Sequence, residues 1–113
     1  MATANLKMKK ATKSAPAIND TLVRTRSIQR TANLLKQLSD PTRLQVITLL
    51  SAGEHHVGGL CDQFDMSPPA VSHHVTQLRH GGIVERRRQG QKNFYSLTDT
   101  GYRLSKIVKG VIR

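Results

Sequence analysis

The side chains best suited to bind a metal are His55, His56 and Cys61, with the carboxylate of Glu54 beside them. Imidazole nitrogens and a thiolate are the ligands that zinc and softer transition metals prefer. However, their spacing matches no known ligand pattern, and adjacent histidines at the start of a helix are more often polar groups that face solvent. A cysteine in an amphipathic helix is more often a small hydrophobic side chain. We therefore predict no metal and no cofactor, and a metal site built from these residues is the alternative.

A second group of side chains with a clear chemistry is basic. Arg86, Arg87 and Arg88 precede a short turn, and Lys92 follows it. The chain has a formal net charge of +11 and a pI of about 10.7, which indicates an anionic partner. An acidic membrane surface is the weaker choice, because no apolar run reaches the length of a spanning helix and no lipidation motif is present. These four side chains are predicted to neutralise phosphates of double-stranded DNA, with a solvated charged face as the alternative.

The middle of the chain predicts two short helices joined by a turn. Residues 57–64 have the apolar spacing of an amphipathic helix, and Asp65 tolerates the left-handed backbone that such a turn requires. Ser67 followed by Pro68 is typical of a new helix start, because serine caps the helix and proline suits its first position. The second helix buries one apolar face, formed by Val71, Val75 and Leu78. Together the two helices indicate a helix-turn-helix.

The opposite side of this second helix is predicted to contact DNA. Because Val71 and Val75 face inward, Ser72, His73 and His74 project toward the groove or its edge. In a helix-turn-helix, residues near the start of the second helix meet base edges in the major groove. The predicted contacts on this helix are Ser67, Pro69, Ala70, Ser72, His73, His74 and Gln77. Packing of one of the histidines against the domain, or a contact to phosphate, is the alternative.

The remaining segments complete a mainly α fold with a small β-hairpin. Residues 20–38 and 40–53 have helical patterns, and residues 83–97 change to the pattern of a hairpin with a basic tip. Thr98 then caps a last helix that carries an apolar face to residue 111. The order of helix, helix, helix-turn-helix, basic hairpin and helix predicts a winged helix-turn-helix. No phosphate-binding glycine loop or paired nucleophile and base indicates an enzyme.

Three motifs resemble one known family. The segments LSDPTRLQVITLL and MSPPAVSHHVTQLRHGGIVERRRQGQKNFYSLTDTG are similar to the arsenical-resistance repressor family of the ArsR/SmtB type, over roughly residues 28–103. The resemblance implies a dimeric repressor that binds a pseudo-palindromic operator and releases it when an inducer binds. It also implies that the first and last helices form the dimer interface. We expect the same interface from the small core, which cannot cover the apolar faces of both helices. The predicted interface residues are Ile28, Ala32, Leu35, Leu104, Ile107, Val108 and Val111.

The metal ligands of this family are missing at the corresponding positions. Where arsenic- and cadmium-sensing members carry a Cys-x-Cys pair, this chain has His56 and Gly58, and Cys61 is out of register. Zinc-sensing members use Asp and His on the last helix, whereas residues 98–113 contain Asp99 and no histidine. The resemblance therefore implies a repressor without the usual metal site. A metal-responsive repressor that uses His55, His56 and Cys61 is the alternative.

We predict a single folded domain over residues 19–113, preceded by a flexible basic tail over residues 1–18. The tail is either a solvated terminus or an arm that touches DNA. One cysteine and the lack of an apolar signal-peptide core indicate a cytoplasmic, nucleoid-associated protein. Two other functions stay open at this point. One is an architectural or anti-silencing DNA-binding protein, and the other is a winged helix that binds proteins instead of DNA.

Overall fold

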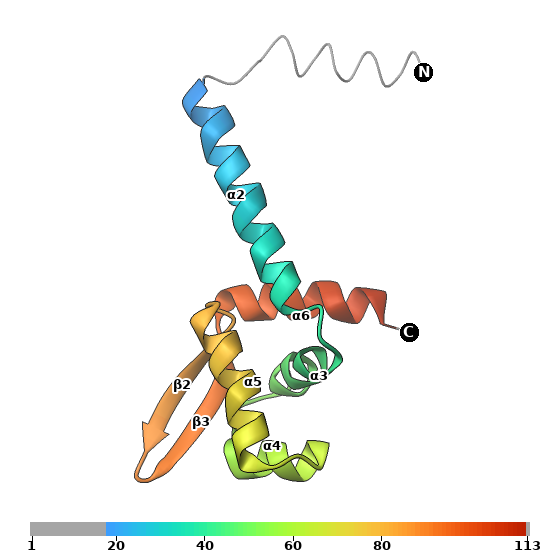
Figure 1. The fold of residues 1–113 in the computed structure, drawn as a ribbon, viewed down its shortest axis with the longest axis vertical. Helices are drawn as coiled ribbons and strands as arrows, with labels where there is room; N and C mark the ends of the chain where they lie inside the picture. The colour runs from blue at the N-terminus through green and yellow to red at the C-terminus, as the bar shows by residue number, and fades with distance from the viewer. Residues whose placement is uncertain (1–17, 113) are drawn as a thin grey trace. The chain divides into compact units, whose positions relative to one another are not determined.

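The computed structural model describes residues 18–112 of the 113-residue chain. Apart from Ile18, the predicted basic tail lies outside the described residues. The elements are, in order, α2 (Ile18–Gln37), α3 (Pro41–Leu50), β1 (His55–His56), α4 (Val57–Phe64), α5 (Pro68–His80), β2 (Val84–Gln89), β3 (Lys92–Leu97) and α6 (Asp99–Val111) (Figure 1). Within this part of the chain, no helix has the length and apolar character that crossing a membrane requires.

The chain divides into two compact units, one that ends at Ala32 and one that begins at Asn33. The described part of the first unit is the beginning of α2, a regular helix. Its side chains from Asp20 to Ala32 are all exposed, Ile28 among them at 68%. The last turns of α2 belong to the second unit, which also contains every other helix and strand of the described chain.

Capping side chains explain why the helices of the second unit begin where they do. The Asp40 carboxylate accepts a hydrogen bond of 3.0 Å from the backbone N–H of Arg43, which starts α3. The Thr98 hydroxyl accepts one of 3.1 Å from Gly101 and starts α6. Between α4 and α5, Asp65 has φ 50° and ψ 48°, the left-handed backbone predicted for this turn. The predicted helix starts and the helix-turn-helix are therefore confirmed.

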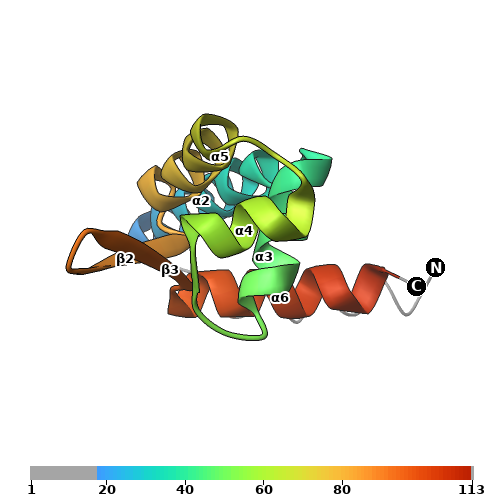
Figure 2. The same cartoon turned by 90° about the horizontal axis from the view of Figure 1, so that it is seen from below.

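The wing is a three-stranded antiparallel sheet in the order β1-β3-β2. Its two longer strands, β2 and β3, lie side by side (Figure 2). The predicted hairpin is present, with Val84 opposite Leu97 and Gln89 opposite Lys92. The third strand, β1, was not predicted, because two residues are too few to show an alternating pattern. It pairs His55 with Tyr95, and it pairs His56 with Phe94. The two histidines are half-buried parts of a sheet and not merely solvent-facing groups at a helix start.

One hydrophobic core joins the helix-turn-helix to the wing and to α6. Its members are Leu38, Val46, Ile47, Leu50, Leu60, Val71, Val75, Leu78, Ile83, Val84, Tyr95, Leu97 and Leu104. The predicted inward face of α5 is thereby confirmed. Leu104 is only 5% exposed, so the prediction that it forms a dimer interface is wrong. Its side chain faces the core because α6 packs against α3 and β3 on that side.

Candidate nucleic-acid interface

The first turn of α5 has no free backbone N–H to offer a ligand. Pro68 and Pro69 have no N–H, the N–H of Ala70 donates to the Ser67 hydroxyl at 3.4 Å, and that of Val71 donates to the Ser67 carbonyl at 3.0 Å. Helix N-termini often bind phosphate through such groups. In this protein, any contact that the start of α5 makes must therefore come from side chains.

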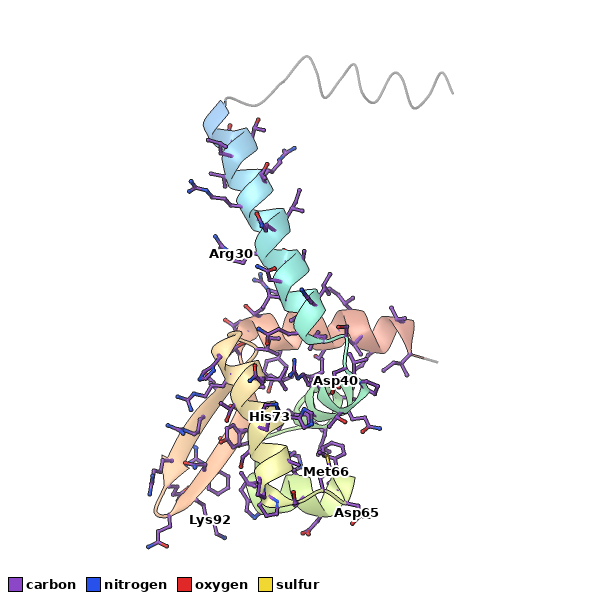
Figure 3. All side chains as sticks on the ribbon, in the orientation of Figure 1. Arg30, Asp40, Asp65, Met66, His73 and Lys92 are labelled. Carbon is purple, nitrogen blue, oxygen red and sulfur yellow. The ribbon has the colours of Figure 1, made fainter. Side chains whose placement is uncertain are left out.

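Those side chains form an open polar face along α5. His73, labelled on α5 in Figure 3, is exposed, and Ser72 and Gln77 are half-exposed. Pro69 and Ser67 are exposed at the start of the helix, and Ala70 is half-buried. This face lies opposite the buried Val71 and Val75, so it is available to a major groove.

Thr76 is a member of this face that the sequence reasoning missed. It lies four residues after Ser72 and three after His73, and its side chain is half-exposed. Residues at these spacings share one side of a helix. The same periodicity that selected Ser72 and His73 could have selected Thr76. Its hydroxyl could donate to or accept from a base edge.

His74 points away from this open face and toward α3. Its Nδ1 lies 4.0 Å from the Asp40 carboxylate, and its side chain is 19% exposed. The same carboxylate caps α3. His74 lies three residues after Val71 and four before Leu78, so it shares their inward side of α5, and its contact with DNA stays a prediction. The alternative prediction was that one of the histidines packs against the domain, and the position of His74 fits it.

The register of the wing divides the three arginines between its two faces. Side chains alternate along a strand, and directly paired residues share a face. Arg86 is opposite the buried Tyr95, and Arg88 is opposite Asn93, so both lie on the side of the sheet that faces the core and α5. Arg87 is opposite Phe94 and lies on the other side.

Lys92 is exposed at the tip of the hairpin (Figure 3). By the register of the strands it lies on the same side as Arg87. Arg86 and Arg88 are exposed as well. Arg88 Nε donates to the Gly90 carbonyl at 3.1 Å, within the hairpin itself. The open polar face of α5 is therefore accompanied by two exposed arginines on its own side of the wing and by one lysine at the tip.

Arg87 is engaged within the protein. Its Nε and Nη2 donate to the two carboxylate oxygens of Glu54 at 3.2 and 2.7 Å, and Nη1 donates to Gln89 at 2.8 Å. The guanidinium carbon lies 4.8 Å from the centre of the Phe94 ring. The hydrogen bond from Arg87 lowers the pKa of Glu54 below its ordinary value and raises the pKa of Arg87. The pair is thus charged at neutral pH.

The candidate metal ligands point in different directions. The ring of His55 bonds to the Gly53 carbonyl at 3.0 Å, on the face of the sheet opposite to that of His56. The His56 ring lies 5.8 Å from the Phe94 ring, and Cys61 packs against the core. Among residues 18–112, no three His, Cys, Asp or Glu side chains lie close enough together to hold a metal ion.

The second unit also exposes an apolar surface at α6. Ile107 is 58% exposed and Val111 is 75% exposed, and Leu35 at the end of α2 is 47% exposed. Together with Leu38, Leu44, Val108 and Ile112 these residues line a hollow of about 250 Å³. Val108 is half-buried against the core, so it belongs only in part to this surface.

Comparison with known proteins agrees with this architecture. A sequence profile described as "Bacterial regulatory protein, arsR family" matches residues 40–86. The transcriptional repressor SdpR of Bacillus subtilis is 37% identical over 68 residues, which cover 60% of this chain and 76% of SdpR. The transcriptional activator HlyU of Vibrio cholerae is 37% identical over 67 residues, which cover 59% of this chain and 62% of HlyU.

A solved structure adds the fold and the assembly of a relative. Mb0332 of Mycobacterium bovis, described as a homodimeric winged helix-turn-helix DNA-binding domain, superposes with a TM-score of 0.70 at 29% identity. The match covers 78% of this chain and 82% of that one. The chain therefore belongs to the arsR family of bacterial regulatory proteins and is a winged helix-turn-helix DNA-binding transcriptional regulator, not an enzyme.

Proposed function

We propose that the protein is a homodimeric, sequence-specific repressor that acts in the cytoplasm. The observation that carries this proposal is the open polar face of α5 beside two exposed arginines, Arg86 and Arg88, on the same side of the wing. An α-helix fits the major groove of B-DNA, and arginines beside it can reach the flanking phosphates.

The proposed roles of the side chains differ along this surface. Ser72, His73, Thr76 and Gln77 would read base edges, which their position on the open side of α5 supports. Ser67, Pro69 and Ala70, at the start of α5, would contact the DNA where the helix enters the groove. Arg86, Arg88 and the tip residue Lys92 would neutralise phosphates, which supplies affinity without sequence preference.

The proposed dimer would form through the exposed apolar surface of α6. Ile107 and Val111 are exposed in the single chain, and burying them against a second copy would remove apolar area from water. From α2, the predicted contributors are Leu35 and, in the first unit, Ile28 and Ala32. A two-fold dimer would hold two copies of α5 about 34 Å apart, one turn of DNA, which requires a pseudo-palindromic operator.

Repression rather than activation is proposed because SdpR is a repressor, although HlyU is an activator. A footprint combined with transcription in vitro decides between them. We expect one discrete palindromic site that overlaps a promoter and a fall in transcript when protein is added. Many weak sites without a consensus would instead indicate an architectural protein, and an increase in transcript would indicate an activator.

The inducer is proposed to be neither arsenite, cadmium nor zinc. The Cys-x-Cys positions of the family are His56 and Gly58 here, and soft metals need thiolate or imidazole ligands held together. Gel-shift titration with each metal at low micromolar concentration should leave the DNA complex intact. Release of the wild type but not of a His56→Ala or Cys61→Ser variant would establish the metal-responsive alternative.

The sequence preference is tested by selecting bound duplexes from random DNA. Ser72→Ala and His73→Ala should each relax the preference at particular base pairs, at a cost of about 1–3 kcal/mol for each base pair that the side chain reads. His80→Ala is the matched control, since His80 is an exposed histidine at the other end of α5. Unchanged preferences in both test variants would contradict this assignment of the reading face.

A further inference from the structure

The contacts of Arg87 suggest a different role from that of its two neighbours. All three of its guanidinium nitrogens are used, two by the Glu54 carboxylate and one by Gln89. Its cationic plane lies 4.8 Å from the ring centre of Phe94. An arginine with a bidentate carboxylate partner and an aromatic face beneath it is held in one geometry. To bind a phosphate it would first have to leave these partners.

These contacts run across the whole sheet. Arg87 on β2 is opposite Phe94 on β3, and Phe94 is in turn opposite His56 on β1. Glu54 lies directly before β1 in the sequence. The ion pair therefore connects the edge strand of the hairpin with the segment that leads into α4, on the side of the sheet away from the core.

The inner part of the hairpin is anchored in the core by Val84, Tyr95 and Leu97, but the outer part of β2 has few other contacts that could set its angle. In β2 only Val84 is buried, and the five following residues are exposed. The third strand, β1, contributes only two residue pairs to the sheet. Without an additional link, the outer part of β2 could tilt relative to α4 and α5, and the arginines on its other face would move with it.

We propose that Glu54 and Arg87 form a wing clamp, in which Arg87 is a positioning residue and not a phosphate ligand. The clamp orients the hairpin so that Arg86 and Arg88 face the DNA backbone beside α5. This inference rests on the proposed function, because it assumes that the wing contacts phosphates. It divides three adjacent arginines into two that bind DNA and one that supports them.

The salt dependence of DNA binding separates the two roles. Each phosphate contact contributes about 0.9 to the slope of log Kd against log salt, or about a 3.5-fold change in Kd between 50 and 200 mM salt. Arg86→Ala and Arg88→Ala should each reduce the slope by about this amount. Arg87→Ala should weaken binding at a given salt concentration, because Arg86 and Arg88 lose their orientation. Added to Arg86→Ala with Arg88→Ala, it should leave the slope unchanged, because the two residues that it positions are already absent. Thermal unfolding followed by circular dichroism confirms that each variant is folded.

The possible outcomes are distinct. A further fall of about 0.9 in the slope when Arg87→Ala is added to the Arg86→Ala, Arg88→Ala variant would overturn the clamp, because Arg87 would then be a phosphate ligand itself. Slopes unchanged in all three single variants would overturn the contact between wing and DNA itself, and with it this part of the proposed function.

A charge swap provides a second test. Arg87→Glu alone should weaken DNA binding, and Glu54→Arg combined with Arg87→Glu should recover most of the affinity by restoring an ion pair across the sheet. Glu85→Arg with Arg87→Glu is the matched control, because it has the same net charge without a pair to residue 54. If the Glu54→Arg swap binds no more tightly than Arg87→Glu or than the control, the clamp is refuted.

Discussion

Placing two carboxylates on the exposed apolar face of α6 should abolish the proposed dimer. Ile107 and Val111 are 58% and 75% exposed in the single chain and line the same hollow. Complete burial of such a side chain is worth about 1.5–3 kcal/mol. Burial of the part now exposed, for both residues in both protomers, therefore contributes roughly 4–8 kcal/mol to association. Desolvation of the new carboxylates would weaken association further.

Since about 1.4 kcal/mol corresponds to a tenfold change in Kd, Ile107→Asp with Val111→Asp should weaken dimerisation by at least about three orders of magnitude. Sedimentation velocity at micromolar concentration should show a dimer for the wild type and a monomer for the double variant. Operator binding should fall strongly as well, because the two copies of α5 are no longer held at a fixed spacing. Binding to a single half-site should change little.

Tyr102→Asp is the control for this experiment. Tyr102 is another exposed apolar side chain of α6, at 42%, but it lines a different surface hollow near β3. The Tyr102→Asp variant should therefore remain a dimer. A wild type that sediments as a monomer, or a double variant that remains a dimer with normal operator affinity, would refute the interface.

Three further predictions concern stability and pH. Gly101→Ala should destabilise the protein by about 1–3 kcal/mol, because a Cβ there would collide with a backbone carbonyl oxygen, whereas Gly110→Ala, with open space around it, should not lower the melting temperature. The wing clamp lowers the pKa of Glu54 from 4.5, so its contribution should be present above that pH and disappear as the pH falls through the lowered value. The difference in melting temperature between the wild type and Glu54→Gln should therefore vanish in acid, and a difference that persists there would contradict the assignment. His74→Ala should weaken binding to all DNA sequences alike and lower the melting temperature, because it removes a half-buried ring from the inward side of α5, 4.0 Å from the Asp40 carboxylate. A weaker preference at one base pair would show instead that His74 reads DNA.

Much of the fold could be predicted because the signals are local. Asp40 before Pro41, Ser67 before Pro68, and Thr98 each satisfy backbone donors at a helix start, and the structure places the helices there. The apolar face of α5 followed from its period alone. These features depend on residues within one or two turns of each other, so the amino-acid sequence by itself determines them.

Contacts between distant segments could not be predicted in this way. The two-residue strand β1 exists only because β3 is available to pair with it. The spacing of His74 from Val71 and Leu78 already turns it inward, but only the tertiary structure shows that α3, with the carboxylate of Asp40, lies there. Leu104 continues the apolar stripe of α6, but the packing of that helix assigns it to the core rather than to a second copy.

The arginines of the wing show the same division most clearly. The sequence by itself determined that three adjacent arginines lie on a strand beside a recognition helix, and side chains alternate along any strand. Which face of the hairpin turns toward α5, and where Arg87 finds its partner, depended on the register with β3 and on a carboxylate 33 residues away. A long-range contact of this kind has no local pattern, because nothing near Arg87 in the sequence depends on Glu54. Only the tertiary structure brings the two together.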